Sequence, residues 1–202
     1  MKIIELSIIL TSKLGKTLAK YEVTWEEWQD VRAWAILNGY SDLANVGEGR
    51  GPKHPVTNVS WYNALKWCNA KSEKENLTPV YQSNVSGITY RMGEINPVTR
   101  SSANGYRLPS ESEWEWAARG GRASAKYPWG NPYLSNAKGC LLANFKPHRG
   151  NYDADGYEYT APANAYSAND YGLYNMAGNV AEWCEDAFVE NANGNDPNNF
   201  DL

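Results

Sequence analysis

Three stretches of the chain repeat hydrophobic residues at the three- and four-residue spacing of an amphipathic helix. Each follows a Thr or Ser that can cap a helix, and the first and third carry a Glu three residues later, which completes a capping box. We therefore predict helices that begin after Thr24, Ser60 and Ser110, with Gly39 and Gly120 ending the first and third. The expected core-facing residues are Trp25, Trp28, Val31, Ala35, Trp61, Ala64, Leu65, Cys68, Trp114, Ala117 and Ala118.

Shorter runs have the composition of strands. Residues 2–10 and 18–23 each predict a strand, with a Lys/Gly turn between them. TPVYQ (78–82) and GITYRM (87–92) predict two more around a turn. The remaining segments are rich in Gly, Pro and Asn, and we expect no helix after residue 121. The pattern predicts one irregular, loop-rich domain over residues 1–202, with three short helices and short strands.

Length and composition support this picture. A chain of 202 residues suits one well-buried domain. The net charge of -4 arises from 19 basic and 23 acidic residues without a block of like charge, so we expect neither nucleic acid nor a membrane surface as a partner. Nine Trp and fourteen Tyr stand against three Phe, which favours irregular backbone, where polar aromatic groups bond to loop carbonyls, or a ligand-binding surface.

The three cysteines are Cys68, Cys140 and Cys184, and no CxxC motif occurs. An odd count is not a disulfide framework; one bridge with a free thiol and three reduced thiols both remain open. The helical spacing favours Cys68 as a small core residue over a nucleophile.

No targeting segment is expected. The first ten residues are apolar, but Glu5 interrupts them and no cleavage pattern follows, so we predict no signal peptide. No run approaches the roughly 18 apolar residues of a membrane span. We expect a soluble, cytoplasmic protein. The sequence does not indicate an oligomeric state.

One segment, YGLYNMAGNVAEWCED (171–186), spaces oxygen donors as a cation loop would. Asn175 and Glu182 could direct side-chain oxygens, and Gly178 and Val180 carbonyl oxygens, at one point, which would suit Ca²⁺. The alternative is an Asn/Gly turn whose side chains cap their own backbone, and spacing alone favours that turn.

A second candidate loop places Asn144 upstream of an Asp-x-Asp-Gly segment at 153–156. Such a segment resembles a fragment of a calcium loop, but the full EF-hand pattern is absent, and an Asx turn explains it equally well. His54 and His148 have no partner at metal-ligand spacing, and we interpret His54 as structural or exposed. Arg107 and the acidic residues 111–115 favour capping over acid–base catalysis. No phosphate loop, GxSxG or HExxH motif occurs.

Four segments together resemble the formylglycine-generating enzyme family, also called the sulfatase-modifying factor domain. They are KYEVTWEEW (20–28), HPVTNVSWYNALKWCN (54–69), GYRLPSESEWEWAARGG (105–121) and YGLYNMAGNVAEWCED (171–186). Their order and spacing match the family over residues 17–186. The resemblance implies a single mixed α+β domain, distantly like C-type lectins, with little regular secondary structure.

The resemblance also implies two Ca²⁺ sites. One falls on the side chains of Asn144 and Asp155 and the carbonyls of Phe145 and Tyr157. The other falls on the side chains of Asn175 and Glu182 and the carbonyls of Gly178 and Val180.

The activity implied by the resemblance is oxidation of a sulfatase cysteine, in a Cys-x-Pro-x-Arg peptide, to formylglycine, with O2 and a copper ion held by two cysteines. In the family that pair follows the EW motif, whereas this sequence ends ENANGNDPNNFDL with neither the pair nor its motif. None of the three cysteines matches the catalytic positions. We therefore expect a domain that is truncated at its carboxyl end and inactive as given.

Two main hypotheses remain. The chain is either a fragment of an enzyme of this family or a non-catalytic, calcium-stabilised binding module for a protein or peptide, such as a retroelement-diversified variable protein. A domain of an ergothioneine-type sulfoxide synthase ranks last, because the preceding iron-binding His bundle of those enzymes is absent here.

Overall fold

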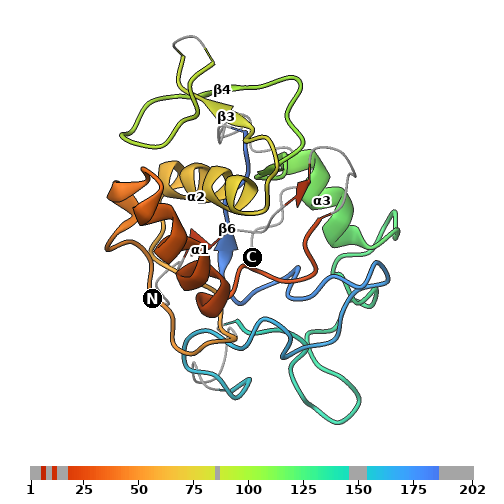
Figure 1. The fold of residues 1–202 in the computed structure, drawn as a ribbon. Helices are drawn as coiled ribbons and strands as arrows, with labels where there is room; N and C mark the ends of the chain where they lie inside the picture. Colours follow the sequence, from red (N-terminus) through yellow and green to blue (C-terminus); the bar gives the residue numbers. More distant parts are fainter. Residues whose placement is uncertain (1–5, 8–10, 13–17, 85–86, 146–153, 187–202) are drawn as a thin grey trace.

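The computed structural model describes residues 6–7, 11–12, 18–84, 87–145 and 154–186 (Figure 1). The helices in this part of the chain are α1 (Trp25–Leu37), α2 (Trp61–Lys74) and α3 (Glu111–Arg119), with a short 3₁₀ helix η1 (Ser41–Leu43). The strands have two residues each: β1 (Leu6–Ser7), β2 (Thr11–Ser12), β3 (Tyr81–Gln82), β4 (Val98–Thr99), β5 (Tyr106–Arg107) and β6 (Ala181–Glu182). The predicted α+β class with three short helices is confirmed.

The helices begin where the sequence predicts. The side-chain oxygens of Thr24, Ser60 and Ser110 accept hydrogen bonds from the backbone N–H three residues on, at 3.3, 3.2 and 3.2 Å. Glu113 also accepts from the N–H of Ser110 at 2.9 Å, so the predicted capping box of α3 is complete. Gly120 ends α3 in the left-handed region, with a φ of 57°.

The main apolar core lies around α1 and α2. The rings of Trp28 and Trp67 are fully buried and stack with centroids 5.3 Å apart and planes inclined by 2°. The Trp67 Nε1–H donates to the carbonyl of Trp28 at 3.2 Å, which satisfies its polar group inside the core. Cys68 is fully buried in the same cluster, as the helical pattern predicts.

The strands form three separate two-stranded pairs. β2–β5 and β3–β4 are antiparallel, whereas β1–β6 is parallel and pairs Leu6 with Ala181. Of these strands, β1 and β3 lie within predicted ones, and the other four do not. The predicted strand 2–10 is described only at Leu6–Ser7, and the rest of it lies outside the described residues. Residues 87–92 form no strand; Thr89 makes an isolated bridge to Gln82, and β3 pairs with β4 instead.

The predicted strand 18–23 is wrong. Its backbone bonds to separate loops: the carbonyl of Lys20 accepts from the N–H of Tyr174 at 3.0 Å, and that of Val23 from the N–H of Val56 at 2.9 Å. An extended segment whose partners come from different loops cannot form a ladder. It crosses instead from the loops near residue 174 to the start of α1.

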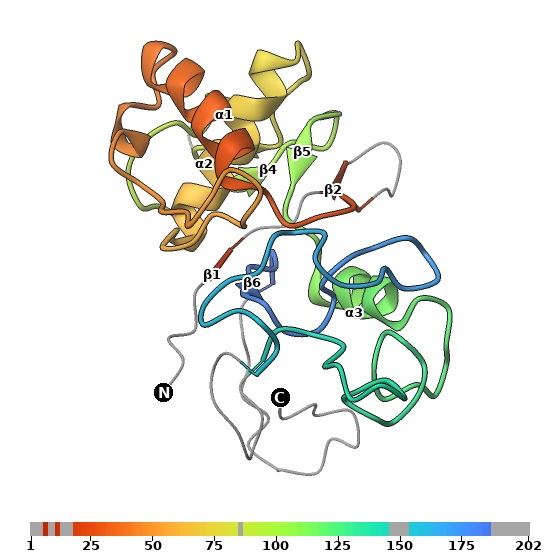
Figure 2. The same cartoon turned by 90° about the horizontal axis from the view of Figure 1, so that it is seen from below.

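After α3 the described residues contain no helix, as predicted, and β6 is their only strand. Figure 2 shows these irregular segments on the opposite side of β1 and β2 from α1 and α2. A second, small apolar cluster lies here, made of Ala117 and Ala118 from α3 with Leu173 and Met176. We refer to the part of the fold around α1 and α2 as the helical half and to residues 122–186 as the loop half.

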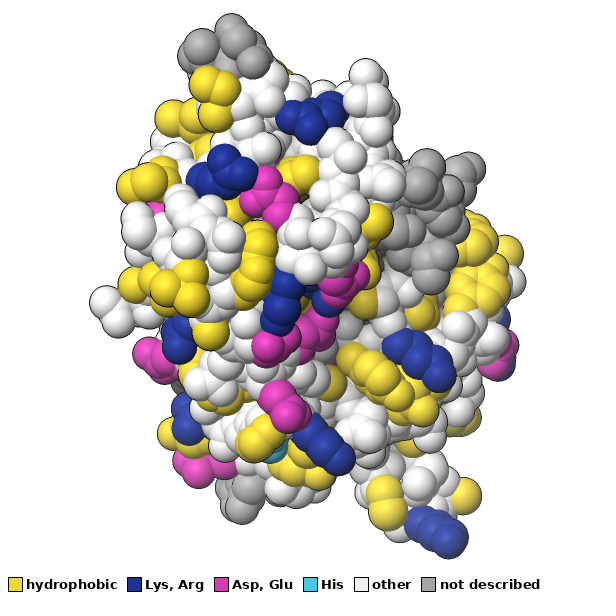
Figure 3. Space-filling model, in the orientation of Figure 1, with side chains coloured by type: hydrophobic (Ala, Val, Ile, Leu, Met, Phe, Trp, Pro, Cys, Tyr) yellow, Lys and Arg dark blue, Asp and Glu magenta, His cyan; other side chains and the backbone are white. Residues whose placement is uncertain are grey.

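The surface carries both signs of charge. On the face shown in Figure 3, Lys and Arg side chains lie interspersed with Asp and Glu side chains. Within the described part of the chain, every helix is too short or too polar to cross a membrane.

Candidate functional site

The loop at 175–182 is a tight turn built from left-handed residues. Asn175, Gly178 and Asn179 have φ values of 51°, 78° and 67°. Asn and Gly tolerate this conformation better than other residues, which explains their place here. Met176, which is buried in the small cluster beside α3, holds the loop against the rest of the fold.

Two oxygens of this loop are buried without a hydrogen-bond partner in the described structure. The Asn175 Nδ2 donates to Glu22 Oε2 at 2.9 Å, which leaves Oδ1 shielded from solvent and without a donor. The Trp114 Nε1–H donates to Glu182 Oε2, while Glu182 Oε1 is also shielded and without a donor. A buried polar atom without a partner is destabilising, and oxygen donors of this kind fit a hard cation such as Ca²⁺. The residues present therefore fit the expected group.

Glu22 is a buried carboxylate that the sequence did not single out. It is 1% exposed, and its two oxygens accept hydrogen bonds from the Nδ2 atoms of Asn175 and Asn179 at 2.9 and 2.8 Å. Burial and the nearby Glu182 carboxylate raise the pKa of Glu22 well above its usual value. Burial likewise raises the pKa of Glu182. Two carboxylates gathered in a dry site repel each other, and a divalent cation beside them would favour their ionised forms.

The second predicted site also comes together. Asp155 accepts from the backbone N–H groups of Phe145 and Tyr157, at 2.9 and 3.0 Å. Asn144 is buried, and its Nδ2 donates to the carbonyl of Tyr159 at 2.6 Å. These two bonds to Asp155 are the ones that an Asx turn would make. An ionised carboxylate has about four acceptor positions, so each oxygen could still bind a cation. Asp153 and His148 lie outside the described residues.

The two loops touch each other. The N–H of Asn179 donates to the carbonyl of Asn144 at 2.7 Å. A Cβ on Gly178 would lie 2.4 Å from the same carbonyl oxygen, closer than real Cβ contacts. Gly178 is therefore required both for its positive φ and for the approach of the first loop.

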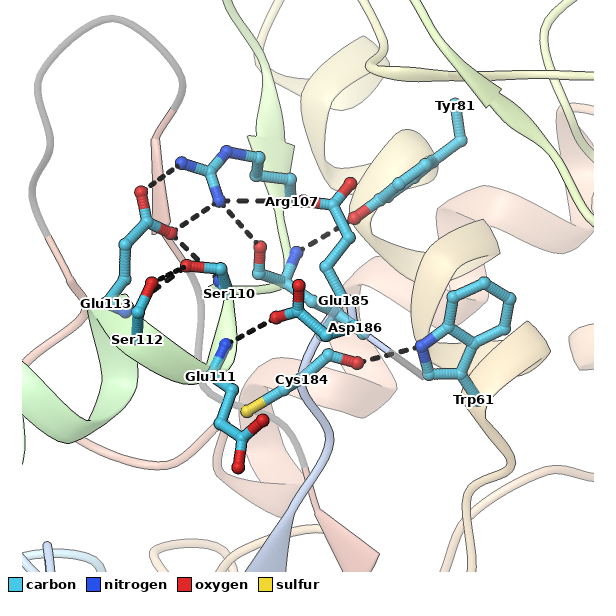
Figure 4. A network of polar contacts seen from close by, with 11 residues as sticks. Trp61, Tyr81, Arg107, Ser110, Glu111, Ser112, Glu113, Cys184, Glu185 and Asp186 are labelled. Atoms are coloured by element: carbon cyan, nitrogen blue, oxygen red, sulfur yellow. Dashed lines mark hydrogen bonds and ion pairs between the residues drawn. The ribbon is translucent and has the colours of Figure 1, made fainter. Parts of the chain in front are cut away.

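Two Trp side chains anchor the segment that follows the loop. The Trp183 Nε1–H donates to the carbonyl of Val59 at 2.9 Å, and the ring packs against the main core. The Trp61 Nε1–H of α2 donates to the carbonyl of Cys184 at 2.9 Å (Figure 4). The loop with its candidate ligands is thus tied to the helical half.

The start of α3 holds the same segment from the other side. The carboxylate of Asp186 accepts from the N–H of Glu111 at 2.5 Å, where the helix leaves backbone donors without intrahelical partners (Figure 4). Nearby, Arg107 makes two hydrogen bonds of 2.7 Å to Glu113, which lowers the pKa of Glu113 to about 2. These contacts support the capping interpretation of Arg107 and the acidic residues around it.

The cysteines do not form a pair. Cys68 is buried, Cys184 is half-buried and Cys140 is exposed, and all three are free thiols, which decides between the two alternatives left open above. Burial raises the pKa of Cys68, and burial with the nearby Glu182 raises the pKa of Cys184 to about 12. Neither of these two is a ready thiolate at neutral pH. His54 Nδ1 lies 2.9 Å from Thr160 Oγ1, which is a structural contact.

An apolar groove lies beside α3. It has a volume of about 90 Å³ and includes Trp114, Ala118, Tyr127 and Met176 in its lining. The sequence does not predict this groove beyond its high content of Trp and Tyr, because the lining combines α3 with loop residues that are distant in the chain.

Known proteins share this scaffold. The sulfatase-modifying factor enzyme 1-like domain family matches residues 15–200. Chaperone protein LppX of Paenibacillus barcinonensis is 35% identical over 179 residues, which is 83% of this chain and 60% of that protein. A formylglycine-generating enzyme of Thermomonospora curvata is 38% identical over 160 residues, 76% of this chain and 41% of the enzyme. The crystal structure of CarF matches with a TM-score of 0.67 and 30% identity, over 86% of this chain and 69% of that chain.

This chain spans 60% and 41% of the lengths of the two curated relatives. The family match covers all four motif segments, including the two candidate cation loops. The fold resemblance to CarF agrees with the irregular α+β architecture expected from the sequence. The chain belongs to the sulfatase-modifying factor enzyme 1-like domain family, and is a formylglycine-generating-enzyme-like domain.

Proposed function

We propose that this chain is a calcium-stabilised scaffold that does not itself oxidise cysteine. The observation that carries the proposal is the pair of buried, unpartnered oxygens on Asn175 and Glu182, beside the carboxylate of Glu22. A Ca²⁺ ion would satisfy both oxygens and offset the repulsion between the two carboxylates.

The residues that would hold the ions are those of the two loops. The first set is Asn144, Phe145, Asp155 and Tyr157, and the second is Asn175, Gly178, Val180 and Glu182. Each set combines side-chain and carbonyl oxygens, the donors that Ca²⁺ prefers. The ions would supply structural rather than chemical function: they would fix irregular backbone that the small apolar cluster beside α3 holds only in part.

Thermal unfolding tests the calcium proposal. We expect the melting temperature to rise with Ca²⁺ and to fall with EDTA. Glu182→Gln should reduce this difference, because it replaces a charged ligand of the second site with a neutral one. Isothermal titration calorimetry should find two bound Ca²⁺ ions per chain. A wild-type melting temperature indifferent to both Ca²⁺ and EDTA would contradict the proposal.

The absence of oxidation rests on the cysteines. The family chemistry requires copper held by a thiolate pair, while the three cysteines of this sequence lie at 68, 140 and 184 and are unpaired. Incubation with a Cys-x-Pro-x-Arg peptide, Cu(I) and O2 should give no aldehyde by mass spectrometry. A formylglycine product would overturn this part of the proposal.

A second candidate function, binding of an apolar peptide, is favoured by the groove beside α3. The rings of Trp114 and Tyr127 lie in its lining, and Trp116 of the same helix is 63% exposed, with its ring tilted by 32° against that of Tyr171 at a centroid distance of 4.8 Å. One relative of this chain is described as a chaperone protein, which supports a binding role for the scaffold. Binding of a Leu-rich peptide, followed by Trp fluorescence, should weaken in Tyr127→Ala, which removes a ring from the groove lining. An unchanged affinity would exclude this surface.

A further inference from the structure

A chain of hydrogen bonds joins the two proposed calcium loops through residues that are in neither ligand set. Asn144 Nδ2 donates to Asn179 Oδ1 at 3.0 Å, and Asn179 Nδ2 donates to Glu22 Oε1 at 2.8 Å. The other oxygen of Glu22 accepts from Asn175 Nδ2 at 2.9 Å. Asn144 and Asn175, one from each loop, therefore stand at the two ends of one network.

The direction of these bonds is fixed by Glu22. In its ionised form, which a cation bound beside it would favour, the Glu22 carboxylate only accepts hydrogen bonds, so both neighbouring amides turn their NH2 groups toward it. For Asn175 this leaves Oδ1 on the opposite side, where it is buried without a donor. Because an amide binds a cation through oxygen and never through nitrogen, this rotation is the one that calcium binding needs.

Asn179 extends the same order to the first loop. Its Nδ2 donates to Glu22 and, at 3.3 Å, to the carbonyl of Ala161, while its Oδ1 accepts from Asn144 Nδ2 and, at 2.7 Å, from the N–H of Ala161. The NH2 group of Asn144 is used by Asn179 and by the carbonyl of Tyr159. Asn179 and the carbonyl of Tyr159 together therefore set the orientation of the Asn144 amide.

Resting on the calcium proposal above, we propose that Glu22 and Asn179 are positioning residues that orient the ligand amides of Asn144 and Asn175 and couple the two calcium sites. Binding at one loop then fixes the shared network and strengthens binding at the other. Residues that orient metal ligands in this way typically change metal affinity 10–100-fold when mutated.

The burial of Glu22 supports this role. The residue comes from the segment just before α1, far from both loops in sequence, and is 1% exposed. A carboxylate is rarely buried so completely unless it is paired or near a metal. Its two oxygens accept from the side chains of Asn175 and Asn179, so its side-chain contacts with the 175–182 loop can orient both amides.

The first experiment compares Glu22→Gln with Glu73→Gln by calcium titration calorimetry. Gln keeps the size of Glu but turns an NH2 group toward one of the two amides, so we expect about 10–100-fold weaker binding at the 175–182 loop. Glu73 is a matched control, because its carboxylate also accepts two side-chain bonds, from Tyr40 at 2.7 Å and Arg91 at 2.6 Å, away from the loops. Glu73→Gln should leave calcium affinity unchanged.

The second experiment measures the coupling with a double-mutant cycle. Asp155→Asn, which weakens the first site, should also lower calcium affinity at the second site several-fold in the wild-type background. In an Asn179→Ala background the same change should have no effect on the second site. This cycle decides the proposal even if Glu22→Gln does not fold.

The outcomes separate the two proposals. If wild-type protein binds no calcium, the calcium proposal fails and the positioning role fails with it. If wild-type protein binds calcium but Glu22→Gln binds it equally well, the positioning role is overturned and the calcium proposal stands. A Glu22→Gln variant whose melting temperature falls equally in Ca²⁺ and EDTA, with unchanged affinity, would show a merely structural role and would also overturn it.

Discussion

The helical half and the loop half reach an ordered structure by different means. Around α1 and α2, large side chains such as Trp28 and Trp67 are fully buried, and apolar contact dominates. In the loop half the apolar cluster is small, and buried amides and carboxylates take its place. Irregular backbone has to bond to side chains because it has no ladder of its own, and this concentrates polar groups where a cation can bind.

The largest effect should come from the helical core. Trp67→Ala removes the ring that stacks on Trp28 and should lower the free energy of unfolding by about 3–5 kcal/mol. Because Trp67 lies in the main core and belongs to neither ligand set, the loss should be the same with and without calcium. Urea unfolding followed by circular dichroism measures it; a calcium-dependent loss would show that the two halves are not energetically distinct.

Calcium removal should destabilise the loop half and leave the helical half nearly unchanged. At a free calcium concentration 100 times the dissociation constant, one site contributes about 2.7 kcal/mol, and EDTA abolishes this contribution. Hydrogen exchange should rise in residues 154–186 and stay nearly constant in α1 and α2. Equal acceleration in both halves would contradict the proposed division.

Gly178 tests how closely the two loops depend on each other. Gly178→Ala should destabilise the chain by about 1–3 kcal/mol, from a strained φ and from contact with the carbonyl of Asn144. Gly139→Ala is a matched control, since its φ is 79° and its Cβ would meet nothing within 4 Å. A smaller loss for Gly178→Ala than for Gly139→Ala, measured by thermal unfolding, would show that the loops are not closely packed here.

The smallest expected effect is on the stability of the fold at acidic pH. Arg107 lowers the folded-state pKa of Glu113 to about 2 from an ordinary 4.5, so this pair stabilises the fold above pH 4.5. That contribution is lost as pH falls from about 4.5 toward 2, and because Glu113 is partly exposed we expect it to be small. Glu113→Gln should flatten this part of the stability profile. A profile unchanged by the mutation would exclude the pair as its source.

The sequence predicted local features well and distant ones poorly. The caps at Thr24, Ser60 and Ser110 depend on a residue and the turn that follows it, and all three are present. The strand expected at 18–23 is absent because its partners come from separate loops. Glu22 carried no local signal, since its partners Asn175 and Asn179 lie 153 and 157 residues away.

The candidate loops show the same limit. Asn/Gly spacing alone predicts a turn at 175–182, and the turn is present. Only the family resemblance implies that oxygens of this turn are calcium ligands. The oxygens that lack a donor can be identified only from the packing. Trp114 donates to Glu182 Oε2, which leaves Oε1 without a donor, and Asn175 turns its Nδ2 toward Glu22, which leaves Oδ1 without one.

The parallel pairing of β1 with β6 has a consequence for synthesis on the ribosome. Leu6 and Ser7 emerge early, yet their partners Ala181 and Glu182 are translated almost at the end of the described chain. α1 and α2, which contact each other directly, can pack as soon as both have left the exit tunnel. The first strand has to wait, so a nascent chain of this protein carries an unpaired edge that only late translation can cover.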